Sequence, residues 1–261
     1  MKYFLILFAS IFSIACRETP KPAVATDSAN PINQELQYPQ ALHNVLEAHG
    51  GLDSWRRQRT LSFTINDEDG AETQTIDLYS RKDKIEGPNY TLGYDGNEVW
   101  LHDPDDMYEG DPVFYHNLMF YFYAMPFVTA DDGILYGAAR DLQFDGKTYP
   151  GVSIRYETGV GSSPKDEYYL YFDPETHVMA WLGYTVTYFS DTASEDVHWL
   201  RYDDWKMVDG LLLPASITWY NYEGRKIKDP RNTVAFDEIN LSEAPNPDVF
   251  YDAPAGASEI E

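Results

Sequence analysis

The residues of this 261-residue chain that could do chemistry are few, and their spacing matches no common catalytic or metal-binding motif. The six histidines never stand four residues apart, as zinc-binding helices require, and no Gly-x-Ser-x-Gly or phosphate-binding glycine motif occurs. The nearest approach to a metal cluster is an acidic turn that contains His102, Asp103, Asp105 and Asp106. His116 could face a pocket, although a hydrogen-bonded buried histidine is the more common case. The sequence therefore predicts no catalytic residue, no metal site and no cofactor.

The only cysteine, Cys16, has a different chemistry. It follows a positively charged start, the apolar run at residues 3–12, and the small residues of Ser13-Ile14-Ala15. This segment resembles a bacterial lipobox, in which the cysteine thiol is diacylated and becomes the mature N-terminus, although Ser13 stands where leucine is preferred. The alternative is an ordinary secretory signal with a chance cysteine. We expect residues 1–16 to be a lipoprotein signal peptide and Cys16 to carry a lipid such as palmitate.

Residues 17–36 are rich in proline, alanine, serine and threonine and have no apolar period, which predicts a flexible tether. Arg17, rather than aspartate, follows the cysteine. By analogy with enteric lipoproteins, this choice favours the outer membrane. Only one acidic residue, Glu18, stands where some bacteria use an acidic run for surface export. We therefore expect a lipid-anchored protein on the periplasmic face of the outer membrane.

The overall charge limits the partners of the protein. Asp and Glu number 43 against 19 Lys and Arg, for a formal net charge of −24. Nucleic acids and anionic lipid surfaces attract basic patches, so this balance argues against both as partners. With 43% hydrophobic and 15% aromatic residues, the chain can nevertheless bury a sizeable core.

One aromatic stretch, at residues 111–127, stands out from the rest of the chain. Asp111 is a suitable N-cap and Pro112 a suitable first helical residue, and Pro126 would end the helix. The predicted helix is apolar on all sides, which indicates burial on more than one side. Its roughly 13 residues are too few to span a bilayer. We interpret it as a plug around which a curved sheet closes.

The remaining elements are one N-terminal helix, a further helical turn that starts at Asp53-Ser54-Trp55, and many strands. The helix is expected to end at His49, favoured there by the helix dipole, before Gly50-Gly51. Turn signals and alternation of apolar and polar residues then predict strands in meander order, and hence an antiparallel sheet. We place these strands at residues 60–66, 72–80, 84–86, 90–94, 98–102, 134–136, 140–144, 149–157, 167–172, 177–189, 197–208, 211–220 and 233–241. The predicted domain covers residues 37–252, with a C-terminal tail at 253–261.

Several short motifs, in this order, resemble the LolA/LolB-like superfamily of periplasmic lipoprotein carriers and receptors. The motifs are Ala48-His49-Gly50-Gly51 with Trp55, the hairpin at 95–104, Tyr171-Phe172-Asp173-Pro174-Glu175-Thr176, Asp209-Gly210-Leu211-Leu212-Leu213-Pro214, and Pro247-Asp248-Val249-Phe250. The resemblance covers residues 40–250 and implies a mainly β (α+β) fold, a strongly curved antiparallel half-barrel with helices packed in its concavity. The stretch 116–127 most resembles a group of Bacteroidota outer-membrane lipoproteins within this fold. Membership of that group implies no activity.

A curved sheet lined by aromatic residues and plugged by an aromatic helix would leave a deep apolar cavity. We therefore expect the protein to bind a hydrophobic small molecule, such as a lipid or acyl chain. The candidate ligand-binding residues are Trp100, Tyr115, His116, Met119, Phe120, Phe122, Tyr123 and Phe127. Two alternatives stay open: a scaffold that fills its own cavity, indicated by a cavity below about 300 Å³, and a hydrolase that uses His102 or His116. The sequence does not identify a protein partner.

Overall fold

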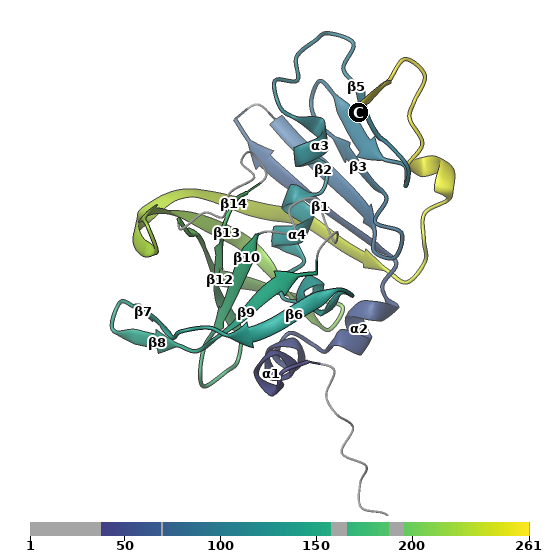
Figure 1. The fold of residues 1–261 in the computed structure, drawn as a ribbon. Helices are drawn as coiled ribbons and strands as arrows, with labels where there is room; N and C mark the ends of the chain where they lie inside the picture. The colour runs from purple at the N-terminus through teal and green to yellow at the C-terminus, as the bar shows by residue number, and fades with distance from the viewer. Residues whose placement is uncertain (1–37, 69, 158–165, 188–195, 261) are drawn as a thin grey trace, which may run out of the picture. The chain divides into compact units, whose positions relative to one another are not determined.

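An antiparallel sheet of 13 strands forms the fold, as seen in a computed structural model that describes residues 38–68, 70–157, 166–187 and 196–260. The predicted signal peptide, Cys16 and the predicted tether lie outside the described residues. The strand order is β15-β5-β4-β3-β2-β1-β14-β13-β12-β11-β10-β9-β6, and the sheet is not closed (Figure 1). This architecture confirms the predicted mainly β class with an open, curved antiparallel sheet.

The first part of the sheet is a meander of five short strands, joined at its edge by the end of the chain. The strands are β1 (Thr60–Asp67), β2 (Gly70–Asp77), β3 (Asp83–Glu86), β4 (Thr91–Tyr94) and β5 (Val99–His102). Each pairs with the next one along the chain. The last strand, β15 (Ser258–Ile260), pairs with β5. The sheet thus extends beyond residue 252, the predicted end of the domain.

The second part of the sheet contains six further strands, of which β12 and β13 are the longest. They are β6 (Ile134–Ala138), β9 (Gly151–Tyr156), β10 (Glu167–Phe172), β11 (Met179–Tyr184), β12 (His198–Val208) and β13 (Leu211–Glu223). The hairpin of β7 (Leu142–Phe144) and β8 (Lys147–Tyr149) forms a separate two-stranded sheet. Strand β11 is shorter than the predicted strand at 177–189, whose last two residues lie outside the described residues.

Strand β14 (Lys226–Ser242) joins the two parts, because its two ends have different partners. Residues from Lys226 to Ala235 pair with β13, and residues from Phe236 to Ser242 pair with β1. The register shifts in both pairings, and Glu238 has a positive φ of 49°. Such irregularities bend a strand and increase its twist, so β14 can run through both parts of a curved sheet.

The aromatic stretch forms two short helices rather than the single helix predicted. The structure has α3 (Pro112–Tyr115), α4 (Leu118–Tyr123) and then the 3₁₀ turn η1 (Phe127–Ala130). Asp111 caps α3 as predicted, since its carboxylate accepts the Phe114 N–H at 3.1 Å. The helix breaks at Asn117, which has φ −117° and ψ 0°. We call residues 111–130 the plug.

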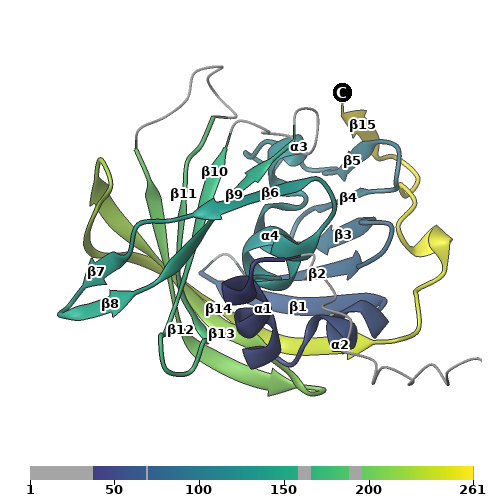
Figure 2. The same cartoon turned by 60° about the horizontal axis from the view of Figure 1, so that its bottom comes forward.

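The plug fills the concave face of the sheet, which we call the inner face. Figure 2 shows α4 between β1–β3 and β6–β9. Met119, Phe120, Phe122 and Tyr123 are all buried in the main hydrophobic core. The Tyr123 ring stacks on Phe63 of β1, with their centroids 4.4 Å apart. The plug is therefore an integral part of the core, and no helix within the described residues is long and apolar enough to cross a bilayer.

The outer face of the second part carries its own aromatic cluster. Antiparallel partners share a face, and Trp181 lies opposite Tyr171 on one side and Arg201 on the other. The neighbouring row, with Leu182 opposite Leu170 and Leu200, points to the inner core. The cluster of Trp181 and its neighbours packs against Leu142 and Phe144 of the β7–β8 hairpin. Strands β10 and β11 are thus buried on both faces, which accounts for their nearly continuous apolar sequence.

Two further helices precede the sheet, α1 (Gln40–Ala48) and α2 (Leu52–Arg57), and a 3₁₀ turn, η2 (Asp248–Phe250), follows it. His49 ends α1, but the prediction that the helix dipole favours it there is wrong. The side chain is fully buried, and burial lowers its pKa to about 4. Its Nδ1–H donates to the Leu212 carbonyl at 2.9 Å, and its Nε2 accepts the Met179 N–H at 3.1 Å. A neutral imidazole therefore ties α1 to β11 and β13.

Candidate functional site

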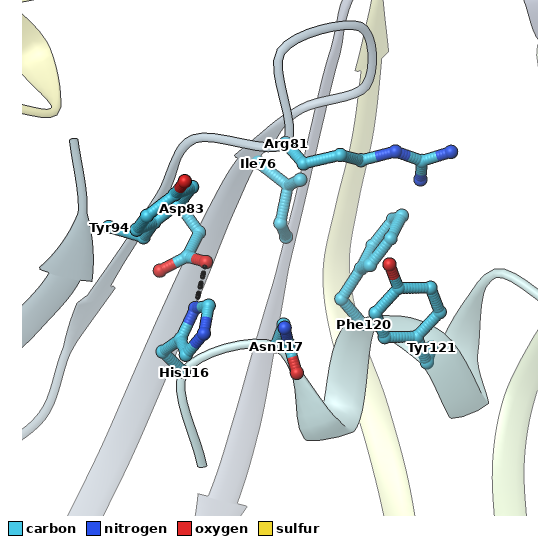
Figure 3. Close-up of a pocket in the computed structure, with 8 residues that line it drawn as sticks. All are labelled: Ile76, Arg81, Asp83, Tyr94, His116, Asn117, Phe120 and Tyr121. Atoms are coloured by element: carbon cyan, nitrogen blue, oxygen red, sulfur yellow. Dashed lines mark hydrogen bonds and ion pairs between the residues drawn. The ribbon is translucent and has the colours of Figure 1, made fainter. Parts of the chain in front are cut away.

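A buried hydrogen-bonded pair holds the break in the plug against the sheet. Asp83 of β3 lies on the inner face because it pairs with Ile76, a core residue, and with Tyr94. Its Oδ2 lies 2.7 Å from Nδ1 of His116, and both side chains are almost completely buried (Figure 3). Burial raises the pKa of Asp83 to about 6, and the hydrogen bond to His116 opposes that rise.

A second carboxylate binds the residue next to His116. Glu72 of β2 is buried on the inner face and accepts a hydrogen bond from the Tyr115 hydroxyl at 2.9 Å. It also accepts hydrogen bonds from Gln74 and Tyr90. Burial and the Glu72 charge raise the pKa of Tyr115. Two adjacent plug residues are thus hydrogen-bonded to two sheet carboxylates, and these contacts accompany the break between α3 and α4.

A small cavity remains beside the Asp83–His116 pair. Its volume is about 50 Å³, and its walls are Ile76, Arg81, Asp83, Tyr94, His116, Asn117, Phe120 and Tyr121 (Figure 3). A buried water needs roughly 10–15 Å³ of such space. The cavity can hold a few waters, and it is far too small for an acyl chain. The plug packs in the core on the concave face, where we predicted a deep aromatic-lined cavity.

A larger cleft opens at the surface beside the plug. Its volume is about 370 Å³, which lies within the usual range of ligand pockets. Three segments line it: α2 with the residue after it, the β2–β3 turn, and η1 with the residues after it. The lining residues are Leu52, Trp55, Arg56, Gln58, Leu78, Tyr79, Arg81, Phe127, Ala130, Asp131 and Asp132. Trp55 and Phe127 stack almost parallel in this lining, with their ring centroids 4.7 Å apart. The cleft therefore combines a buried aromatic surface with charged residues.

Arg81 lines both the cleft and the small cavity. Its Nη2 binds both carboxylate oxygens of Asp131, at 2.8 and 2.7 Å, and its guanidinium lies 5.1 Å from the centre of the Phe120 ring. Burial raises the pKa of Asp131, and Arg81 opposes the rise. Because Arg81 contributes to both walls, this ion pair lies where the cleft and the interior cavity approach each other.

The structure does not bring the predicted ligand-binding residues together. Phe127 lines the cleft, whereas His116 and Phe120 line the small cavity. Tyr115 is bound to Glu72, and the other three predicted residues of the plug lie in the core: Met119, Phe122 and Tyr123. The plug residues were predicted as one lining because a single continuous helix was expected. Because the helix breaks at Asn117 and is buried on several sides, the plug residues face different parts of the protein.

Trp100, the remaining predicted residue, lies on the opposite face of the sheet. It pairs with Gly93, whereas its neighbour Val99 pairs with Tyr94 in the inner-face row. Successive residues of a strand point to opposite faces, so Trp100 faces outward. There it is covered by the C-terminal segment, and its indole N–H donates to the Tyr251 carbonyl at 3.0 Å. Trp100 therefore takes no part in either cavity.

The two histidines considered for catalysis are also separated. His102 is two residues after Trp100 on β5 and so shares its outer face, whereas His116 lies in the plug on the inner face. Asp103, next to His102, accepts the backbone N–H groups of Met107 and Tyr108 at 3.0 and 2.8 Å. These hydrogen bonds fit the interpretation of this segment as an acidic turn. No group of residues that could hold a metal ion occurs in the described part of the chain.

The residues that form the cleft were missed for a simple reason. Arg81 and Asp131 are 50 residues apart in the sequence, and neither stands in a motif. Trp55 was noted as part of a helical turn and of the resemblance, and Leu52, Arg56 and Leu78 look like ordinary helix and strand residues. The only sequence signal for the charged residues of the cleft was that arginines are scarce in a chain of net charge −24.

Comparison with a solved structure supports the fold. A LolA superfamily protein from Nitrosomonas europaea is similar in structure, with a TM-score of 0.50, 9% identity, and coverage of 82% of this chain and 96% of that one. A DUF1329 family protein from Desulfovibrio piger has a TM-score of 0.44, 11% identity, and coverage of 80% and 97%. The model of a family of unknown function, DUF6503, matches residues 101–199. None of the curated proteins compared with the chain matches it.

Proposed function

From the LolA-like fold of this chain as a premise, we propose that the protein is a lipoprotein of the outer membrane whose surface cleft binds one amphiphilic molecule with an acyl chain. It would be anchored through Cys16 on the periplasmic face, and it would not be an enzyme. The observation that carries the proposal is the cleft of about 370 Å³ with a buried aromatic surface. This site replaces the interior cavity that we first expected.

Part of the cleft lining is apolar, which would suit an acyl chain. Trp55, Leu78, Phe127 and Ala130 are each less than a tenth exposed, and all four line the cleft. Burial of apolar surface contributes about 25 cal/mol per Å², so the part of this lining that is still exposed would contribute to binding through the hydrophobic effect. The charged residues of the lining would then remain for the polar end of the ligand.

The chain enters the described unit next to this cleft. The Tyr38 hydroxyl donates to the Ala130 carbonyl at 3.3 Å and accepts from Arg56 Nη2 at 2.9 Å. An extended chain spans at most about 3.3–3.6 Å per residue, so the segment from Cys16 to Tyr38 would reach on the order of 70–80 Å. Anchoring through Cys16 would keep the cleft within that distance of the membrane that supplies its ligand.

Replacement of Leu52 by aspartate tests the cleft. We expect Leu52→Asp to weaken the binding of an acyl-chain probe at least tenfold, since it places a charge on the apolar lining at a cost of roughly 1.4 kcal/mol or more. An acidic residue is tolerated at the start of a helix, and Leu52 is the first residue of α2. The measurement is titration of the full-length chain, in micelles of a non-ionic detergent, with a fluorescent fatty acid.

The matched control is Leu135→Asp, the same change at an exposed leucine of β6 that does not line the cleft. Leu135→Asp should bind the probe like the wild type, and thermal unfolding should show that both variants are folded. Equal binding by folded Leu52→Asp and the wild type would refute the cleft as the site.

The anchor has its own test. In cells fed an alkyne-labelled fatty acid, we expect the wild-type chain to carry the label and to fractionate with the outer membrane. Cys16→Ser should lose the label completely, because Cys16 is the only thiol in the chain. Retention of the label by Cys16→Ser would contradict acylation at this residue.

A scaffold without a ligand is the second candidate, and one specific observation favours it. The interior cavity measures only about 50 Å³, well below the 300 Å³ typical of ligand pockets, because the plug fills the concave face. On this alternative the full chain, purified gently from envelope membranes, would give a ligand-free mass by native mass spectrometry, and in-cell cross-linking would capture a protein partner. A co-purified lipid that is lost in Leu52→Asp would instead support the cleft.

A further inference from the structure

The charges of the cleft differ from those of the rest of the protein. Two arginines and two aspartates line it: Arg56, Arg81, Asp131 and Asp132. Their formal charges sum to zero, in a chain whose net charge is −24. Since charges interact appreciably over roughly 8 Å at physiological salt, these four charges would act directly on a ligand in the cleft.

Two of the four charges neutralise each other. Nη2 of Arg81 binds both carboxylate oxygens of Asp131, so these two charges are paired with each other. Arg56 contacts two neutral oxygens, the Tyr38 hydroxyl and the Ala130 carbonyl. Among the residues that the structure describes, neither Arg56 nor Asp132 takes part in an ion pair of 4 Å or less, and both are exposed. Within the described residues, the cleft therefore presents one guanidinium and one carboxylate that form no direct ion pair, although the charge of Arg56 also acts on Asp131.

We propose that the cleft selects a zwitterionic phospholipid, whose phosphate binds Arg56 and whose ammonium group binds Asp132. This inference rests on the proposed function and deepens it. A guanidinium offers paired N–H donors that match phosphate oxygens, and a carboxylate accepts the N–H groups of an ammonium. A purely anionic head group would meet Arg56 but would be repelled by Asp132. An uncharged head group would leave both charges unpaired.

The test compares three lipids with identical acyl chains: phosphatidylethanolamine, phosphatidylglycerol and diacylglycerol. The full-length chain in non-ionic detergent is titrated with each lipid and observed by native mass spectrometry. We expect phosphatidylethanolamine to bind at least fivefold more tightly than either of the others, since each exposed charge pair contributes up to about 1 kcal/mol.

Two variants assign the charges. Asp132→Asn should weaken the binding of phosphatidylethanolamine about fivefold, because this lipid carries an ammonium group. The binding of phosphatidylglycerol, which has no ammonium group, should stay the same or become stronger. Arg56→Gln should weaken the binding of both phospholipids, because both carry a phosphate. The controls are Asp105→Asn in the acidic turn and Arg57→Gln, the neighbour of Arg56 on α2, which does not line the cleft. Both controls should bind like the wild type.

The possible outcomes separate this inference from the function on which it rests. If phosphatidylglycerol binds as tightly as phosphatidylethanolamine, or if Asp132→Asn leaves their ratio unchanged, the head-group assignment is wrong and a lipid-binding cleft still stands. If none of the three lipids binds, and the fluorescent fatty acid does not bind either, the proposed function itself fails.

Discussion

Replacement of Asp83 by alanine is expected to lower the free energy of unfolding by about 3 kcal/mol and to loosen the plug. The Asp83 carboxylate lies 2.7 Å from His116, and both side chains are almost completely buried. Removal of one partner leaves the other buried without its hydrogen bond, which costs more than the pair itself contributes. The stability change can be measured by urea denaturation at pH 7.

The local effect separates a clamp on the plug from a general loss of packing. Amides of residues 112–123 should exchange hydrogen faster in Asp83→Ala than in the wild type, whereas those of β10 and β11 should change only with global stability. Asp83→Asn is the matched control, because its amide oxygen can still accept the His116 hydrogen bond. Uniform acceleration over the whole chain would contradict a clamp on the plug.

The same pair predicts a pH dependence of defined sign. Burial raises the pKa of Asp83 from 3.8 to about 6 in the folded protein. The part of its contribution to stability that depends on protonation is therefore fully present below pH 3.8 and is lost as the pH rises through 6, whereas its hydrogen bond to His116 remains. Asparagine does not titrate, so Asp83→Asn should gain stability relative to the wild type as the pH rises from 4 to 6. If the difference in stability between Asp83→Asn and the wild type stays constant over this range, burial does not raise the pKa of Asp83.

Replacement of His49 by alanine is expected to cost about 3–5 kcal/mol. The imidazole donates to the Leu212 carbonyl and accepts the Met179 N–H, so alanine leaves two buried backbone groups unpaired and opens a cavity. The loss should separate α1 from the strands on which it packs. The control is His43→Ala on the same helix, where no more than about 0.5 kcal/mol is expected because that side chain is only partly buried.

The penalty for losing His49 should shrink in acid. Its pKa is lowered from 6.5 to about 4 in the folded protein, so its contribution is present above pH 6.5 and is lost as the pH falls through 4. The difference between wild type and His49→Ala should therefore fall by up to about 3 kcal/mol between pH 7 and pH 4. A penalty that grew in acid would mean that His49 is charged in the folded state. The slope is opposite to that of Asp83, so the two contributions oppose each other between pH 4 and 6.

The sequence by itself determined the class of fold. Alternation of apolar and polar residues locates most strands, because a strand with one buried face must repeat every two residues. Turns such as Asp209-Gly210 could be located because both residues have positive φ, a conformation that few other residue types adopt readily. Asp111 and Pro112 marked the true start of α3, since capping depends only on neighbouring residues.

Only the tertiary structure decided which aromatic residues face a cavity. Trp100 and Leu101 are equally apolar and adjacent, and the register of β4 with β5 alone decides which of them faces inward. The break at Asn117 has no strong signal of its own, and it accompanies contacts of Tyr115 and His116 with carboxylates more than 30 residues earlier in the chain. His49 looked like a helix-capping cation, and burial under distant strands makes it neutral.

The cleft depends on the tertiary structure even more strongly. Its lining comes from α2, the β2–β3 turn and η1, which no local pattern connects, and the Arg81–Asp131 pair joins residues 50 positions apart. Local periodicity and capping arise from interactions between near neighbours, and these can be read from the sequence. A binding surface arises where distant segments meet, and its position depends on how the sheet curves and what fills it.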